Sequence, residues 1–167
     1  AEPRKNLSSL LRAHTLLPKK IRKDHKLLFV GFDGWKNKDI SPLLDELKGS
    51  VEYIGYVSDD VLARLYSNAA CLVYPSLYEG FGFPPLEAMA CGCPVVVSKV
   101  ASLPEVCGDA AFYIDPHDID SIVDGIYKVL TDNALRESLI EKGLERVKLF
   151  SWDKAAREHL RIFAELL

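Results

Sequence analysis

The sequence predicts an α/β fold, a Rossmann-like doubly wound parallel sheet, and two observations lead to it. Short apolar runs rich in β-branched and aromatic residues alternate with amphipathic stretches, and each run ends at Gly, Pro, Ser or Asp. Runs that are apolar without alternation suit strands buried on both faces, as in parallel sheets. Regular alternation of strand and helix favours right-handed crossovers. Strands are therefore expected at 26–30, 51–54, 70–74, 94–97 and 110–114.

The segments between these runs have apolar residues at helical spacing. Two residues that can cap a helix with their side chains, Asn6 and Ser58, precede two of the segments. The pair Pro84-Pro85 fits the first turn of another helix, because proline is tolerated there. Helices are therefore expected over 7–17, 59–68, 84–91, 118–130, 133–149 and 152–166.

The expected sheet lacks its first strand. The chain opens with Ala1-Glu-Pro-Arg-Lys-Asn6, which leads directly into a helix. The first strand of a doubly wound half-domain is usually central in the sheet. We therefore expect either a segment cut from a longer chain or an incomplete sheet. Residues 1–150 are expected to form the domain and 151–167 a separate amphipathic helix, with Trp152, Ala155, Ala156, Leu160 and Phe163 apolar.

Size and composition are those of one globular domain. The chain has 167 residues, of which 49% are hydrophobic and 27% charged, and this balance excludes collagen-like, disordered and low-complexity proteins. No apolar run approaches the roughly 20 residues that span a bilayer, and no signal peptide is recognisable. A net charge of -3 argues against a nucleic-acid partner. We expect a soluble, cytoplasmic protein.

Basic residues are concentrated near the N-terminus, where residues 1–26 hold eight Lys and Arg and two acids. The run 19–23 follows Pro18 and is interpreted as a solvated loop, with a weak membrane-surface or acidic-partner patch as the alternative. Cys71 and Cys93 lie in apolar runs and are expected to be buried thiols in a reducing compartment. Neither the CxC at 91–93 nor the four scattered His has the spacing of a metal site, so none is expected.

Residues 74–89 carry the most functional information. They leave a strand, pass two glycines and enter a helix, and open α/β sheets bind ligands at this edge. Gly80 and Gly82 allow close backbone approach to a ligand or a positive φ. The N-terminus of the following helix is suited to phosphate. Because prolines have no N–H, the expected amide donors are Phe81, Gly82, Phe83 and Leu86.

Two carboxylates flank this loop. Glu87 is expected in the first turn of the helix, where it could simply complement the helix dipole. Glu79 has no evident structural task. A pair of carboxylates can indicate a glycosidase. Because both lie on one short loop beside an anion site, binding the hydroxyls of a phosphorylated sugar fits better.

The segment Glu79-Gly-Phe-Gly-Phe-Pro-Pro-Leu-Glu87, two glutamates with seven residues between them, resembles the signature of retaining GT-B glycosyltransferases of family four. Further segments occur in the order of that family. The resemblance covers nearly the whole chain and implies the C-terminal, nucleotide-sugar-binding half of a two-domain enzyme. The further segments are Glu2-Pro-Arg-Lys-Asn6, Gly55-Tyr-Val-Ser, Leu65-Tyr-Ser-Asn-Ala69, Ser102-Leu-Pro-Glu-Val106, Gly108-Asp-Ala110 and Phe150-Ser-Trp152.

The resemblance also implies roles for individual residues. Glu79 would bind hydroxyls of the donor sugar and Glu87 the ribose hydroxyls. Lys5, and with it Arg4, would neutralise the diphosphate, whose negative charge grows as it departs. With Glu79 these two form the implied catalytic set. The implied donor-binding residues are Val57, Gly80, Phe81, Gly82, Phe83, Leu86 and Glu87.

The activity implied is that of a retaining, metal-independent hexosyltransferase without a cofactor. The segments at 2–6 and 102–106 resemble the mannosyl- and rhamnosyltransferase branch, which favours GDP-mannose as donor and a UDP-sugar as second choice. Implied partners are an N-terminal domain outside this sequence, a glycan or lipid-linked acceptor, and the inner membrane face as a peripheral contact. Two alternatives stay open: a sugar-nucleotide epimerase of GT-B architecture and a non-catalytic nucleotide-sugar-binding module.

Overall fold

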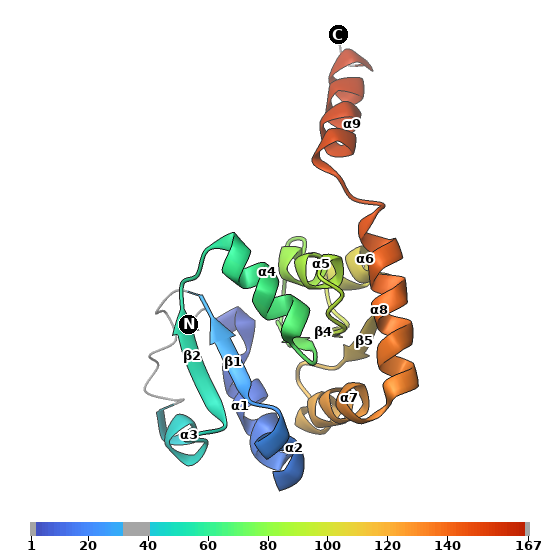
Figure 1. The fold of residues 1–167 in the computed structure, drawn as a ribbon. Helices are drawn as coiled ribbons and strands as arrows, with labels where there is room; N and C mark the ends of the chain where they lie inside the picture. Colours follow the sequence, from blue (N-terminus) through green and yellow to red (C-terminus); the bar gives the residue numbers. More distant parts are fainter. Residues whose placement is uncertain (1–2, 32–40, 166–167) are drawn as a thin grey trace.

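The computed structural model describes residues 3–31 and 41–165, and it alternates strands with helices as expected (Figure 1). Each of the five predicted strands is present within one or two residues of its expected position. In chain order the described elements are η1 (Pro3–Lys5), α1 (Leu7–Leu16), α2 (Lys19–Asp24), β1 (Leu27–Val30), α3 (Ser41–Glu46), β2 (Val51–Gly55), α4 (Asp59–Asn68), β3 (Leu72–Tyr74), α5 (Phe83–Ala90), β4 (Val95–Ser98), α6 (Leu103–Cys107), β5 (Ala111–Ile114), α7 (Ile119–Thr131), α8 (Asn133–Val147) and α9 (Trp152–Glu165).

The strands form two separate parallel sheets. β1 pairs with β2, and β3, β4 and β5 pair in that order. Parallel pairing and strand–helix alternation confirm the α/β prediction. Among the described residues, β1 and β3 each have one edge without a neighbouring strand. The described strands therefore form two sheets with no pairing between β1 and β3.

Helices cover both faces of the three-stranded sheet. Val95 and Val97 of β4 pack in a core cluster with residues of α5 and α6. Val96, which points the other way, packs in a second cluster with residues of α1 and α7. All of β4 is buried, as predicted for a strand between two helix layers.

The prediction that every strand is buried on both faces is wrong for β1 and β2. Their side chains alternate between half-buried and exposed positions, and Leu28, Val30 and Ile54 are exposed. In the described part of the chain no further strand pairs with β1 or β2, and these apolar side chains remain in contact with solvent. Cys71 is likewise only half-buried, because it lines a cavity beside the edge of β3.

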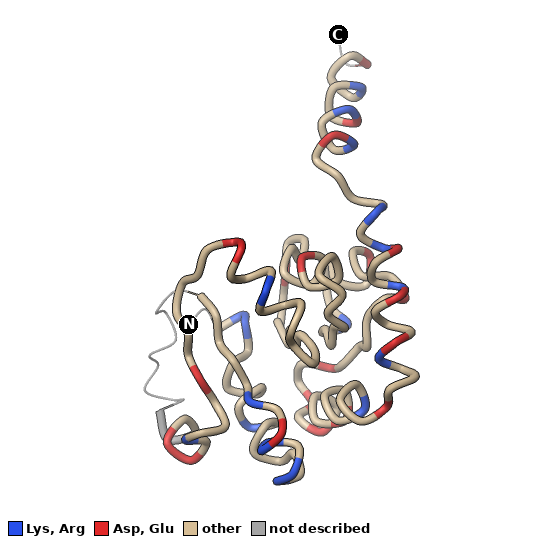
Figure 2. The backbone as a smooth tube through the Cα atoms, viewed as in Figure 1, with Lys and Arg blue, Asp and Glu red and all other residues tan. Residues whose placement is uncertain are grey.

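The structure also differs from the prediction at two expected helix caps and at one expected loop. Asn6 and Ser58 precede α1 and α4, but neither side chain makes the capping hydrogen bond. The basic run that follows Pro18 forms the short helix α2, whose basic residues stand out in Figure 2. Proline fits the start of a helix as well as its end, so Pro18 separates α1 from α2 without forcing a loop.

The C-terminal helix α9 extends away from the rest of the molecule (Figure 1). None of its described residues is buried, and Trp152 and Leu160 are 79% and 66% exposed. It begins at the position where the sequence analysis separated it from the domain.

Candidate functional site

The loop after β3 lies at the carboxyl edge of the sheet, beside the N-terminal segment of the chain. The amide of Leu77 donates a hydrogen bond of 2.7 Å to the carbonyl oxygen of Arg4. Glu79 follows in the same loop and is only 7% exposed, although loop carboxylates usually face water. The backbone contact therefore brings the basic pair next to a buried carboxylate 75 residues away in sequence.

Four side chains form a compact charged cluster here. Arg4 Nη1 donates to Glu79 Oε2 and Lys5 Nζ to Glu79 Oε1, each at 2.7 Å. The Tyr74 hydroxyl donates to Glu79 Oε1 at 2.8 Å and accepts from Lys5 Nζ at 2.7 Å. Lys5 Nζ also lies 4.8 Å from the centre of the Tyr74 ring. We refer to Arg4, Lys5, Tyr74 and Glu79 as the charge cluster.

The cluster carries a fixed set of charges. Burial acts to raise the pKa of Glu79, but hydrogen bonds from Lys5 and Tyr74 outweigh it and hold the pKa below its usual value. Burial, together with the hydrogen bond to Glu79, raises the pKa of Tyr74 well above its usual value. At neutral pH one carboxylate thus faces two cations and a neutral phenol. The cluster keeps a net positive charge, which attracts anionic ligands.

Asn6 holds the basic pair in place. It adopts a left-handed conformation with φ of 55°, which asparagine tolerates better than most residues. Its side-chain amide donates to the carbonyl oxygens of Pro75 at 3.2 Å and Pro116 at 2.8 Å. The expected capping residue therefore ties the start of α1 to two loops at the edge of the sheet.

Gly80 and Gly82, the two glycines of the loop, differ in their structural roles. Gly82 has φ of 111°, and a Cβ there would lie 2.7 Å from Leu103 Cδ2, so the fold itself requires glycine. A Cβ on Gly80 would meet no atom within 4 Å. The Ser102 hydroxyl, shared between the carbonyl oxygens of Glu79 at 2.9 Å and Phe81 at 2.8 Å, holds the loop in shape. The positive-φ interpretation thus applies to Gly82, and only close approach remains for Gly80.

Helix α5 begins one residue earlier than predicted, at Phe83. Glu87 consequently lies beyond the first turn, and its expected position in that turn is wrong. The residue as a whole is exposed, but partial burial of its carboxyl group, followed by the nearby Asp59 carboxylate, raises its pKa. The rings of Phe81 and Phe83 are exposed and lie 4.8 Å apart. Leu86 has its side chain in the core, so only its backbone could meet a ligand.

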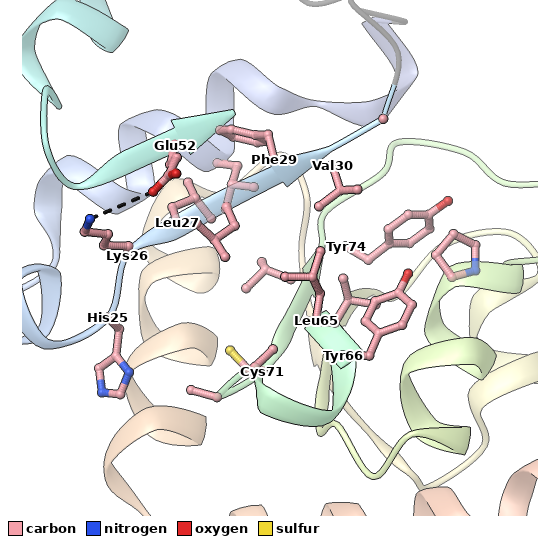
Figure 3. A pocket seen from close by; sticks show the side chains of 18 of the residues that line it. His25, Lys26, Leu27, Phe29, Val30, Glu52, Leu65, Tyr66, Cys71 and Tyr74 are labelled. Carbon is pink, nitrogen blue, oxygen red and sulfur yellow. Dashed lines mark ion pairs between the residues drawn. The ribbon is translucent and has the colours of Figure 1, made fainter. Parts of the chain in front are cut away.

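A cavity of about 1130 Å³ adjoins the cluster (Figure 3). Lys5 and Tyr74 line it together with Val57 and Glu87, whereas Glu79 is not among the lining residues. Lys5 and Tyr74 therefore join the charge cluster to the predicted nucleotide-binding residues, and Lys5 is the cation of the two. Arg4 and the loop 79–83 also lie outside the cavity lining.

Three residues at the site escaped the sequence analysis: Asn6 in its observed role, Tyr74 and Ser102. Tyr74 is the last residue of a strand at the carboxyl edge, and that position is the one signal that could have pointed to it. Ser102 contacts the loop across 21 to 23 residues of sequence, which no local pattern reveals.

Two negative findings apply to the described part of the chain. At 3–31 and 41–165, no three His, Cys, Asp or Glu side chains are grouped so that they could hold a metal ion. Within the same ranges, no helix has the length and apolar character needed to cross a membrane.

The fold and the loop at its carboxyl edge agree with comparisons to known proteins. Residues 1–146 match the protein family described as "Glycosyl transferases group 1", and the chain belongs to this family. A relative is the "O-antigen chain mannosyltransferase B" of Escherichia coli, 44% identical over 97% of this chain and 43% of that protein. The "Serotype-specific mannosyltransferase WbdA" of Escherichia coli is 35% identical over 99% of this chain and 21% of its own length.

A solved structure also resembles the fold of this chain. The sucrose-phosphate synthase of Thermosynechococcus elongatus superimposes with a TM-score of 0.85 and 31% identity, over 99% of this chain and 43% of that one. The chain thus spans less than half the length of the relatives described. The resemblance stated from the sequence, and the fold it implied, are confirmed.

Proposed function

We propose that this chain is the donor-binding half of a retaining, metal-independent hexosyltransferase that transfers mannose from GDP-mannose to a glycan or lipid-linked acceptor. The observation that carries the proposal is the position of Lys5, which pairs with Glu79 and also lines the cavity with Val57 and Glu87. One cation between a sugar-binding carboxylate and a nucleotide-binding wall is what a nucleoside diphosphate sugar requires. The printed names of the relatives support mannose as the sugar.

In this proposal the diphosphate lies beside Lys5 and Arg4 and in front of the N-terminus of α5. Cations and helix amides that are in place beforehand stabilise the negative charge that develops as the nucleoside diphosphate leaves. Arginine can bind phosphate through two nitrogens, whereas lysine acts as a point charge. Since these groups carry the charge, the reaction needs no metal ion.

The remaining roles in the proposal are those that the family resemblance implies. Glu79 binds hydroxyls of the sugar and Glu87 those of the ribose, while the backbone of Val57 contacts the base. Gly80, Phe81, Gly82 and Phe83 present their backbone to the sugar and diphosphate, and Leu86 contributes only its amide. A UDP-sugar is the second choice of donor.

We further propose that residues 151–167 pack against a second domain of a longer protein. Helix α9 exposes Trp152, Leu160 and Phe163, and the relatives are more than twice as long as this chain. That domain would hold the acceptor against the donor, because transfer needs both at near-attack distance. The chain by itself is then expected to bind donor without transferring sugar. The complete enzyme would act in the cytoplasm, in peripheral contact with the inner membrane face.

Calorimetric titration of this chain with GDP, UDP and ADP tests the proposal. GDP is expected to bind most tightly, with unchanged affinity in EDTA and weaker binding by Lys5→Ala as the matched variant. The Lys5→Ala loss is expected to shrink as salt rises, because charge contacts of a partly exposed lysine are screened. No binding of any of the three nucleotides, or loss of binding in EDTA, would overturn it.

A further inference from the structure

Arg146 is half-buried near the C-terminal end of α8, which lies beside α6 in Figure 1. Its Nε donates a hydrogen bond of 2.9 Å to the carbonyl oxygen of Val106, and its Nη2 donates to that of Glu105. The last carbonyl oxygens of a helix have no partner within the helix, and the helix dipole is negative there. The forked, positively charged guanidinium is suited to such a pair of acceptors. Arg146 therefore fixes the C-terminal end of α6 to α8.

The N-terminal end of α6 supports the loop 79–83, which we refer to as the donor loop. The hydroxyl of Ser102, directly before α6, is shared between the carbonyl oxygens of Glu79 at 2.9 Å and Phe81 at 2.8 Å. The next residue, Leu103, is fully buried and lies so close to the second loop glycine that a Cβ there would be 2.7 Å from Leu103 Cδ2. Because α6 has only five residues, a displacement of its C-terminal end also displaces the end that contacts the donor loop.

A second support reaches the donor loop through aromatic rings. The guanidinium carbon of Arg146 lies 5.4 Å from the centre of the Phe150 ring, a distance typical of a cation–π contact. Phe150 meets the ring of Phe81 edge to face, with the ring centres 5.9 Å apart and the planes at 85°. Arg146 thus contacts both structures that hold the donor loop, α6 through hydrogen bonds and Phe150 through its charge.

We propose that Arg146 is a positioning residue for donor binding, an inference that rests on the proposed function of the donor loop. It holds the end of α6 and the ring of Phe150, and through Ser102 and Phe81 these keep the loop backbone and the Glu79 carboxylate in place for the sugar and diphosphate. Binding groups act only when the residues around them lock their geometry. Loss of Arg146 therefore loosens the donor loop without removing any group that the proposed function assigns to the donor.

Two measurements on the whole chain test this inference: NMR order parameters of the backbone amides without nucleotide, and affinity for GDP-mannose and GDP. Arg146→Met keeps an apolar stem but removes the donors and the charge. The order parameters at Gly80, Phe81 and Gly82 are expected to be about 0.85 in the unmodified chain and below about 0.6 in the variant. Affinity for GDP-mannose is expected to fall about fivefold to tenfold, and affinity for GDP by less than about threefold, because the displaced loop carries Glu79.

Arg136→Met is the matched control. Arg136 is half-buried in the same helix, and its guanidinium donates to the side chain of Asn133 one turn earlier, so neither measurement is expected to change. Arg146→Lys keeps the charge beside Phe150 without the fork, and its loss of affinity for GDP-mannose is expected to be about twofold to threefold. Since Arg146 acts through Ser102, the loss in Arg146→Met combined with Ser102→Ala is expected to be smaller than the product of the two single losses.

Unchanged order parameters of the donor loop in Arg146→Met, or equal changes in Arg136→Met, would overturn the inference. Loss of order in β4 as well as in the loop would also overturn it, because Arg146 would then support the whole fold. A loosened loop with unchanged affinity for GDP-mannose would show that donor binding does not need this support. If Arg146→Met does not fold, Arg146→Lys and Ser102→Ala carry the same comparison. The order parameters are measured without nucleotide, so their outcome is distinguishable from a failure of the proposed function.

Discussion

The two ends of the segment 79–87 differ sharply in environment. Glu79 is buried, paired with two cations and hydrogen-bonded to Tyr74, and these contacts lower its pKa. Glu87 is exposed as a residue, but partial burial of its carboxyl group, and then the Asp59 carboxylate, raise its pKa. The two glutamates look equivalent in the sequence, but their environments differ. Glu79 is held as an anion by its hydrogen-bond partners, whereas Glu87 lies near another negative charge.

This difference indicates that Glu79 supports the structure of the site, whereas Glu87 is available to bind a ligand. Glu79 is part of the structure that positions Lys5 and Arg4, so a ligand that uses those cations must share them with Glu79. Glu87 makes no ion pair within the described ranges, and a hydroxyl donor from a ligand would relieve its unfavourable surroundings. The predictions below test this contrast in order of expected effect.

The largest effect is expected at the glycine between the two glutamates. Gly82→Ala is expected to lower the free energy of unfolding by about 2–4 kcal/mol, because φ is 111° and the Cβ would overlap buried Leu103. Gly80→Ala, whose Cβ meets nothing, is the matched control and should stay within about 0.5 kcal/mol. Urea denaturation measures both, and equal losses would contradict the assignment of the turn to Gly82.

At the exposed end, Glu87→Ala is expected to weaken binding of a nucleoside diphosphate by about 1.5–3 kcal/mol, the value of hydrogen bonds to a charged acceptor. Unfolding should barely change, because the side chain is exposed. Glu137→Ala on the exposed face of α8 controls for loss of one negative charge. An unchanged dissociation constant would show that Glu87 does not contact the nucleotide.

At the buried end, Glu79→Ala is expected to weaken a nucleoside diphosphate sugar about tenfold, or 1.4 kcal/mol, and to leave the bare diphosphate nearly unaffected. The loss is smaller than for Glu87 because both Glu79 oxygens already accept hydrogen bonds from Arg4, Lys5 and Tyr74, which leaves less capacity for the sugar hydroxyls. Parallel titrations with GDP and GDP-mannose measure the difference. Equal losses for both ligands would show that Glu79 acts only by supporting the loop.

Tyr74→Phe removes the hydroxyl that bridges Lys5 and Glu79 while keeping the buried ring. Affinity for a nucleoside diphosphate is expected to fall by about 0.5–1.5 kcal/mol, the net value of a hydrogen bond. Tyr78→Phe, in the same loop and 63% exposed, should have no effect. Identical affinities for the two variants would show that the hydroxyl does not position Lys5.

The smallest effects concern pH. A carboxyl whose pKa is lowered in the folded state stabilises it above the usual pKa of 4.5, and this contribution disappears as pH falls through the lowered pKa. The unfolding free-energy difference between the unmodified chain and Glu79→Gln should therefore shrink below pH 4.5. Glu87 has a raised pKa, so its carboxylate opposes folding at neutral pH and Glu87→Gln should show the opposite trend. Matching pH profiles would contradict the contrast.

The position of each strand was predictable from local apolar runs, because burial in a sheet leaves a pattern over four or five neighbouring residues. The exposed alternation of β1 and β2 was not predictable, since the covering of a strand's two faces depends on segments that are distant in sequence. Short helices such as α2 were missed for a related reason: six residues hold too little periodicity to distinguish a helix from a charged loop.

By itself the sequence determined the α/β class and the family resemblance, because these depend on local pattern and on one spaced motif. Only the tertiary structure decided how they are arranged. It joined Arg4 and Lys5 to Glu79, placed Tyr74 between Lys5 and Glu79, and lined one cavity with residues of β1 and β3. Ion pairs across about 75 residues and the packing of separate sheets depend on how the chain folds back on itself, which no local sequence pattern encodes.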